Sequence, residues 1–308
     1  MTNAAFARLT DRARQPEERK ATAAYLTENL KRFVKNGEKV LICFPNREPD
    51  AISGLLEKAV VDAGAVPLFW GPDFRWKALL RLAFSHRPNV IIGPPLVLLG
   101  LTKISRAAGT PLSVRHVVTA GYPCLDWMKD GIIRGLDCTI WGVFGPGTGA
   151  IVSGFSCGKS SGVHLRSDLY DAQIMDERGE PAPEGALGDL ILWRKDEPQT
   201  RFVTQERARL STDPCPCGCD SPRLWDLQAD KGADQSIVEL RSTLHQWTSI
   251  LDCKIQKGES GLELEVITFP GEKLPVFPAC AKRIVRPWDP EKDEPFWYAP
   301  RPANEMFF

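Results

Sequence analysis

Along the first 145 residues, segments with the hydrophobic spacing of helices alternate with short apolar runs. The runs are rich in Val, Ile and Leu, as is typical of buried strands. We predict helices at 1–35, 50–64, 75–86, 96–109 and 125–135, and strands at 39–45, 65–71, 89–95, 114–121 and 136–145. Strands that alternate with helices in this way favour a parallel sheet with helices packed on its faces.

The pattern changes after about residue 150. Apolar and polar residues then alternate in short strands at 163–176, 187–194 and 199–210, with polar turns between them. This alternation predicts an antiparallel β subdomain attached to the parallel sheet. Beyond a polar hinge at 229–234, we predict a helix at 235–247, a hairpin at 250–269 and an irregular, proline-rich tail over the last forty residues.

These elements predict an α/β fold with two domains. The large domain covers 1–228: a parallel sheet with flanking helices, and a β insert at about 150–226. The small C-terminal α+β domain covers 229–308 and includes the irregular tail. A chain of 308 residues is long enough to bury a core in each.

Composition narrows the class of partner. Lys plus Arg equals Asp plus Glu at 39 each, so no net positive charge points to nucleic acid or an anionic membrane. No apolar run reaches the roughly 18–20 residues of a membrane span. The first 15 residues lack the apolar core of a signal peptide. We therefore expect a cytoplasmic protein that binds neither nucleic acid nor membrane.

Four of the nine cysteines are clustered in two segments. Cys157 and His164 lie in SCGKSSGVHL, and DPCPCGCDSP holds Cys215, Cys217 and Cys219. Thiolates and imidazole are the usual ligands of structural zinc, which takes four of them in a tetrahedron. Cys157, His164, Cys215 and Cys217 offer that set and leave no open position for chemistry, so zinc here would be structural. Cys219 competes for one ligand position, and a reduced, metal-free loop is the alternative.

A glycine-rich turn, Gly145-Pro146-Gly147-Thr148-Gly149, follows the last predicted strand of the parallel sheet. Ligands of such sheets bind beyond the carboxyl ends of the strands. We expect a binding site at this turn.

Residues 138–226 resemble the phenylacetate–coenzyme A ligases, and in particular the zinc-containing branch of these adenylate-forming enzymes. The matching pieces, in the family's order and spacing, are Cys157, SGVHL with His164, DERGEPAPEGALGDLIL, RFVTQE and CPCGCDSPRLW. The resemblance implies that Cys157, His164, Cys215 and Cys217 bind zinc.

Enzymes of that family use ATP to convert a carboxylic acid to an acyl-adenylate and then transfer the acyl group to coenzyme A. The resemblance therefore implies ATP or AMP, magnesium and coenzyme A as cofactors, and an acyl or aryl carboxylic acid as ligand. It implies a nucleotide site at Gly145, Gly147, Thr148 and Glu206.

Several catalytic groups of the family have no counterpart here. No acidic residue lies between Asp137 and Asp168 to take the place of the magnesium-binding glutamate. Glu206 replaces the aspartate that binds the ribose, and the hinge at 228–230 lacks the expected arginine. The family's phosphate loop, expected before residue 10, and its C-terminal Gly-Lys pair are not found. Because one positioned donor contributes about 10²–10³ in rate, we expect impaired or lost adenylation.

Three hypotheses follow, and none assigns a catalytic residue. The first is a truncated, zinc-stabilised relative with degraded adenylation, which binds a nucleotide, an acyl ligand or a protein partner near Gly145 and Glu206. The second is an active ligase or acyl-transfer enzyme that uses Lys159, Arg201 or a partner chain. The third is a non-catalytic interaction scaffold, with the aromatic segment 295–308 as its docking element.

Overall fold

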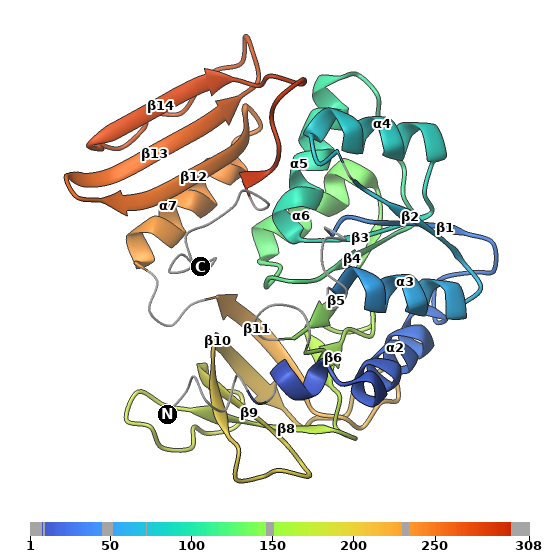
Figure 1. Cartoon of the computed structure of the whole chain (residues 1–308). Helices are drawn as coiled ribbons and strands as arrows, with labels where there is room; N and C mark the ends of the chain where they lie inside the picture. Colours follow the sequence, from blue (N-terminus) through green and yellow to red (C-terminus); the bar gives the residue numbers. More distant parts are fainter. Residues whose placement is uncertain are drawn as a thin grey trace.

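The computed structural model describes residue 8 and residues 10–44, 52–71, 73–145, 151–229 and 234–296, except for the side chains of 205, 229 and 235. An 11-stranded mixed sheet and a three-stranded sheet organise these residues (Figure 1). Helices flank the large sheet, and the small sheet has a helix of its own. The predicted α/β fold class is confirmed.

The parallel half of the large sheet has the strand order β2-β1-β3-β4-β5. Its strands are β1 (Lys39–Ile42), β2 (Val66–Phe69), β3 (Val90–Gly93), β4 (His116–Thr119) and β5 (Thr139–Phe144). Its helices are α2 (Pro16–Leu30), α3 (Ile52–Asp62), α4 (Trp76–His86), α5 (Pro95–Ala107) and α6 (Asp126–Leu136). The predicted alternation is confirmed, although the strands are shorter than expected.

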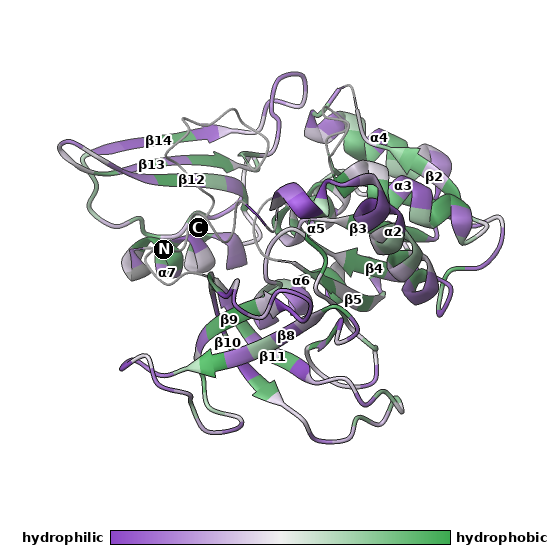
Figure 2. Ribbon diagram, turned by 60° about the horizontal axis from the view of Figure 1, so that its bottom comes forward, coloured by the Kyte–Doolittle hydropathy of each residue, from purple (hydrophilic) through white to green (hydrophobic). Residues whose placement is uncertain are grey.

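Side chains of the parallel strands point alternately to two apolar layers. Val40 and Ile42 pack with α2 and α3 on one face, and Leu41 packs with α4 and α5 on the other. In Figure 2, the hydrophobic colour is clear on β4 and β5.

The helix predicted over 1–35 is interrupted. Residues 10–13 are helical, and α2 then runs only from Pro16 to Leu30. Gln15 has an extended backbone, with ψ at 143°. A residue before proline is disfavoured in the helical region, because its backbone clashes with the proline ring. The break therefore falls where Pro16 requires it.

The antiparallel half continues directly from β5, in the order β5-β6-β7-β11-β10-β9-β8. Its strands are β6 (Gly154–Phe155), β7 (Val163–Leu165), β8 (Tyr170–Met175), β9 (Gly188–Arg194), β10 (Phe202–Ser211) and β11 (Arg223–Ala229). The strand predicted at 163–176 is two strands, because a turn in which the Leu169 amide donates to the Arg166 carbonyl separates β7 from β8. The sequence pattern did not predict β11.

The C-terminal module, residues 234–296, contains α7 (Gln235–Gln246), β12 (Ile250–Gly258), β13 (Gly261–Thr268) and β14 (Lys282–Pro287). The predicted helix and hairpin are confirmed. The tail predicted to be irregular contains β14, which pairs in parallel with β13. Most of β14 is exposed, so it lacks the buried apolar face from which a strand is predicted. The boundary at 228/229 stays a prediction.

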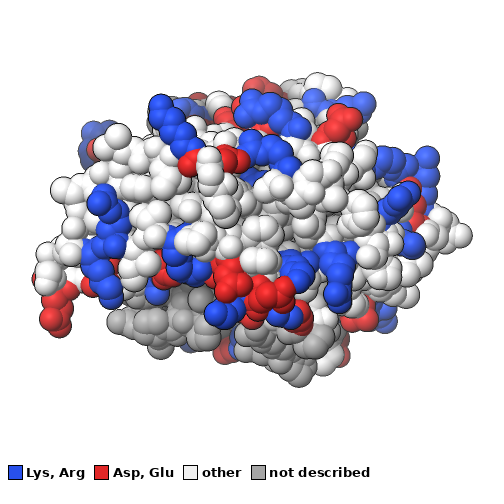
Figure 3. Space-filling model, turned by 90° about the horizontal axis from the view of Figure 1, so that it is seen from above, with Lys and Arg blue, Asp and Glu red and all other residues white. Residues whose placement is uncertain are grey.

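Charged side chains of both signs are mixed over a mostly uncharged surface on the face seen in Figure 3. Within the described part of the chain, no helix combines the length and the apolar character needed to cross a membrane.

Candidate metal centre

The four predicted metal ligands come together where β7 pairs with β11. Cys157 follows β6 and His164 lies on β7, whereas Cys215 and Cys217 lie in the turn from β10 to β11. Arg223 of β11 is paired with His164, which brings the turn to the strand. The four ligand atoms all lie within 4.8 Å of one another. Cys157 Sγ is 3.7 Å from Cys215 Sγ, and Cys217 Sγ is 3.3 Å from His164 Nε2.

Two of the cysteines are each followed by a glycine in the left-handed region, Gly158 with φ at 68° and Gly218 with φ at 81°. This conformation, which costs glycine little, turns a backbone amide back toward the preceding sulfur. The Lys159 amide donates to Cys157 Sγ at 3.4 Å, and the amide two residues after Cys217 donates to its Sγ at the same distance. Such bonds stabilise thiolates.

His164 is oriented by the other nitrogen of its ring. Nδ1 lies 3.0 Å from the carbonyl oxygen of Ser221, to which it donates as the protonated nitrogen. This bond leaves Nε2 unprotonated and directed at the sulfurs, the arrangement that metal-binding histidines share. The side chain is only 6% exposed.

The cysteines of the cluster influence one another's pKa. Burial alone would raise the pKa of Cys215, but hydrogen bonds from Ser160 and the Cys217 amide outweigh it, and the pKa falls to about 7. Ser160 Oγ lies 3.1 Å from Cys215 Sγ and 3.4 Å from Cys157 Sγ. Burial, together with the neighbouring thiols, raises the pKa of Cys217 to about 11. Thiolates at this spacing repel one another, and a divalent cation between them would remove that repulsion.

The donor set fits a structural zinc ion: three sulfurs and one imidazole nitrogen, mostly buried, with backbone donors behind them. Cys219, the competing ligand, lies outside this group among the described residues, and its backbone amide donates to Cys217 Sγ. Binding of zinc itself stays a prediction.

Of the four predicted nucleotide residues, the structure describes Gly145 and Glu206. Gly147 and Thr148 lie outside the described residues. Gly145 directly follows β5 and Glu206 lies on β10, with β6, β7 and β11 between these strands in the sheet order. A side chain at Gly145 would collide with the carbonyl oxygen of Ile151, so backbone packing already requires glycine there. Nucleotide binding at these residues stays a prediction.

Lys159 and Arg201 are the two cations that we considered for alternative phosphate chemistry. Lys159 is exposed beside the cluster. Arg201 stacks its guanidinium over the Trp193 ring at 4.4 Å and donates to Gln173 Oε1 at 3.3 Å. These contacts give no support to an active ligase that uses Lys159 or Arg201.

Arg32, in the turn that follows α2, was missed by the sequence reasoning. Its guanidinium donates to the carbonyl oxygen of Cys157 at 3.0 Å and lies over the Trp141 ring at 5.4 Å. Arg32 thus joins α2 to the loop that carries the first metal ligand. No local pattern marks it, because its partner lies 125 positions away in the chain.

No protein-family model matches the sequence, and no curated protein matches it significantly. Solved structures do match. A 2-hydroxyisobutyryl-CoA ligase in the postadenylation state aligns with a TM-score of 0.68 at 14% identity, covering 93% of this chain and 69% of that one. A benzoate CoA ligase from Burkholderia xenovorans aligns with a TM-score of 0.55 at 14% identity, covering 86% and 62%.

The amide bond synthetase McbA from Marinactinospora thermotolerans aligns with a TM-score of 0.50 at 14% identity, covering 86% of this chain and 61% of that one. The chain has the adenylate-forming fold. It spans between 61% and 69% of the length of these three enzymes. The fold implied by the sequence resemblance is confirmed, whereas the phenylacetate–coenzyme A ligase branch stays a prediction.

Proposed function

We propose that this protein is a zinc-stabilised relative of the phenylacetate–coenzyme A ligases with strongly reduced or lost adenylation, and that its cleft still binds an adenine nucleotide or an acyl- or aryl-adenylate. Two observations together carry the proposal. The chain has an adenylate-forming fold, and the segment between Asp137 and Asp168 lacks the acidic residue that the family uses to bind magnesium. The 2-hydroxyisobutyryl-CoA ligase structures are complexes with HIB-AMP, in some cases together with CoA. The same ligand class is our proposal for this cleft.

The missing magnesium-binding carboxylate supports the proposed loss of adenylation. Adenylation requires magnesium and cationic donors to neutralise charge on the phosphates as the bond to pyrophosphate breaks. No carboxylate lies between Asp137 and Asp168 to hold that magnesium. Glu206 can still accept hydrogen bonds from ribose hydroxyls, so binding can persist where turnover does not.

The proposed zinc ion has a structural role. Bound by Cys157, His164, Cys215 and Cys217, it would cross-link the loop after β6 to the turn after β10, beside the pairing of β7 with β11. Four protein ligands leave no position for water or substrate. The ion would take no part in acyl transfer.

Metal content tests the zinc proposal. We expect one zinc per purified chain, and for the cobalt-substituted protein the absorption of a tetrahedral thiolate site. Cys215→Ser should lose the metal. Cys219→Ser and Cys280→Ser, a cysteine of the C-terminal module, should keep it. A metal-free wild type, or loss of metal in Cys219→Ser alone, would contradict the ligand assignment.

Calorimetric titration of magnesium-ATP into the zinc-loaded protein tests the cleft. We expect weak binding that Glu206→Gln reduces about tenfold, the effect of a lost charge-assisted hydrogen bond, while the exposed control Glu180→Gln leaves it unchanged. No pyrophosphate release is expected with a panel of aryl and acyl acids. Turnover at the 1–10³ s⁻¹ typical of enzymes would instead establish an active ligase. Absence of any binding would favour the interaction scaffold.

A further inference from the structure

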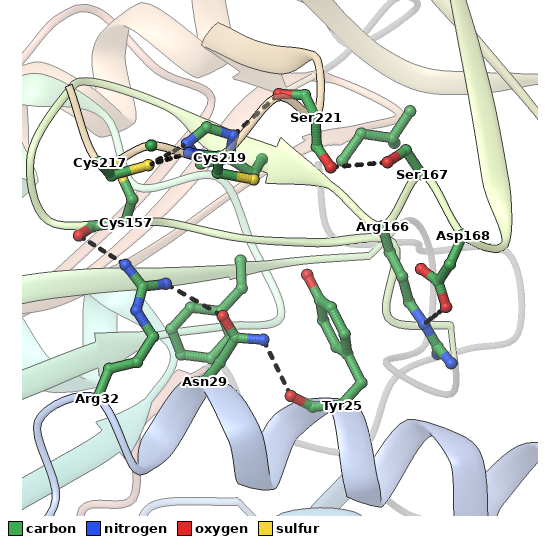
Figure 4. A pocket seen from close by; sticks show the side chains of 14 residues that line it. Tyr25, Asn29, Arg32, Cys157, Arg166, Ser167, Asp168, Cys217, Cys219 and Ser221 are labelled. Carbon is green, nitrogen blue, oxygen red and sulfur yellow. Dashed lines mark hydrogen bonds and ion pairs between the residues drawn. The ribbon is translucent and has the colours of Figure 1, made fainter. Parts of the chain in front are cut away.

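A cavity of about 450 Å³ lies between α2 and the metal cluster. Tyr25 and Asn29 of α2 form one side together with Arg32, which follows the helix, and Figure 4 shows them rising toward the strand segment that carries Arg166. The other side is the end of β7 and the turn around Cys219, and it includes three of the proposed zinc ligands, Cys157, His164 and Cys217. We call this cavity the α2 pocket. Its volume lies within the roughly 300–1,000 Å³ of small-molecule sites.

The α2 pocket contains a buried cation with few partners. Arg166 is 6% exposed, and its Nη1 donates to Thr22 Oγ1 at 3.2 Å. Its Nε makes no hydrogen bond, and the Asp168 carboxylate lies 3.5 Å away at ion-pair distance. The Asp168 side chain is 68% exposed, so solvent screens it and it is free to move. A buried guanidinium with an unused donor is costly unless an anion completes its bonding.

Beside Arg166 the pocket lining is partly apolar. Phe155 and Leu165 line the cavity, and the Arg166 guanidinium lies 4.9 Å from the centre of the Tyr25 ring. Burial raises the pKa of Tyr25 to about 12, so its hydroxyl stays a neutral donor at physiological pH. The lining therefore places one buried positive charge beside Phe155 and Leu165, which are 1% and 2% exposed.

We propose that the α2 pocket binds a monocarboxylic acid with an apolar body, its carboxylate paired with Arg166 and its body against Phe155 and Leu165. The planar guanidinium matches a carboxylate in two parallel hydrogen bonds. A phosphate dianion fits less well, because Asp168 would repel its second charge. The bound acid joins α2 to β7 beside the metal cluster. This inference does not rest on the proposed function, because none of these residues belongs to the predicted adenylate cleft.

Cys219 supplies a direct test, because it lines the pocket and lies outside the metal-ligand group. The experiment measures the rate at which iodoacetamide alkylates Cys219 in the zinc-loaded full chain, followed by peptide mass spectrometry. Benzoate is the probe. We expect millimolar benzoate to slow the reaction saturably, acetate to act more weakly because it lacks the apolar body, and inorganic phosphate to have no effect.

Variants connect the protection to the pocket. Arg166→Gln should raise the benzoate concentration for half-protection about 10- to 100-fold. Asn29→Phe, which fills the mouth of the pocket and leaves the buried arginine in place, should abolish protection even if Arg166→Gln fails to fold. Lys20→Gln, exposed on the same helix, and Glu206→Gln, in the predicted cleft, should behave as wild type.

The proposal is wrong if benzoate leaves the alkylation rate of the wild type unchanged. It is also wrong if phosphate protects as well as benzoate, or if a folded Asn29→Phe variant is still protected. Loss of protection in Glu206→Gln would move benzoate to the adenylate cleft instead.

Discussion

Two junctions hold this molecule together in different ways. The first, which we call the metal junction, lies between α2 and the antiparallel strands. It consists of the Arg194–Glu18 pair, the bond from Arg32 to the Cys157 loop, and the Cys/His cluster. The C-terminal interface joins the C-terminal module to α5 through apolar side chains. The first depends on a few directional contacts between charged or polar groups, and the second on apolar area.

In the metal junction, arginines hold α2 at both ends. Arg194, only 4% exposed, donates to both carboxylate oxygens of Glu18 at 3.1 and 2.9 Å near the start of the helix. Arg32 lies beyond its last residue and holds the loop of Cys157. Bidentate and charge-assisted bonds of this kind are strong and demand a fixed geometry. Each contact therefore depends on its own partner.

In the C-terminal interface, Leu251, Ile267 and Phe269 share one apolar core with α4, α5 and α6. One cation lies among them: Lys103 of α5, which is 6% exposed. Its Nζ donates to the carbonyl oxygens of His245, Trp247 and Ile250 at 2.7, 3.2 and 2.6 Å. The ammonium group thus satisfies carbonyls at the C-terminal end of α7, where a positive charge is favourable.

Because the two junctions depend on different interactions, we expect different changes to destabilise them. With zinc bound as proposed, we expect loss of the ion to release the loop after β6 and the turn after β10 together, because the same ion would hold both. An apolar interface loses stability in proportion to the volume removed. Removing metal should therefore act on one part of the molecule, and truncating a core side chain on the other.

Metal removal should have the largest effect. Zinc binding contributes about 10–16 kcal/mol in zinc-finger peptides, so we expect chelation or Cys215→Ser to lower the free energy of unfolding by several kcal/mol. Hydrogen exchange should show faster amide exchange in β6, β7 and β11, while α7 and β12–β14 keep their protection. Equal loss of protection in both regions would show that they unfold as one unit.

Phe269→Ala should come next. Truncating a phenylalanine that is 4% exposed costs about 3–5 kcal/mol, through lost contacts and the cavity left behind. Urea unfolding measures this loss in the free energy of unfolding. The zinc content of the variant should not change. Val276→Ala, at a side chain that is 99% exposed, is the matched control and should stay within about 0.5 kcal/mol of wild type. Loss of zinc in Phe269→Ala would mean that the two junctions are coupled.

Lys103 should make stability depend on pH. Burial lowers its pKa to about 8 in the folded protein, whereas the unfolded value is near 10.4. Between these values Lys103 binds more protons in the unfolded chain, so its contribution to stability rises with pH through this window. Lys103→Met should remove this contribution. At neutral pH the variant should lose about 1–3 kcal/mol, because three carbonyls lose their donor. Urea unfolding at pH 7 and pH 9.5 separates the two effects, and identical pH slopes would contradict the assignment.

Arg32→Gln should have the smallest effect. It removes a hydrogen bond to a neutral carbonyl at a partly exposed site, which is worth about 0.5–1.5 kcal/mol. Contacts just outside a metal's ligands influence affinity by about 10- to 100-fold, and we expect the lower end because Arg32 contacts the Cys157 backbone rather than its sulfur. Zinc release to a chelator measures the change. Lys31→Gln, at an exposed neighbour, should release zinc as wild type does.

The contrast between directional contacts and apolar packing also explains which parts of the site could be predicted from the sequence. Metal ligands are restricted to a few residue types, so Cys157, His164, Cys215 and Cys217 stood out and the structure brings them together. Gly145 also stood out, but the structure gives a packing reason for its glycine, and its nucleotide role stays untested.

From the sequence alone, the order of helices and strands up to β5 could be determined, because apolar periodicity is a local property of the chain. Only the tertiary structure decided that β11 and β14 are strands, since their pairing depends on partners elsewhere. It also decided that Arg32 and Arg166 meet at one pocket and that the C-terminal module shares a core with α5. Apolar attraction has no direction, so the sequence of a buried face does not name its partner.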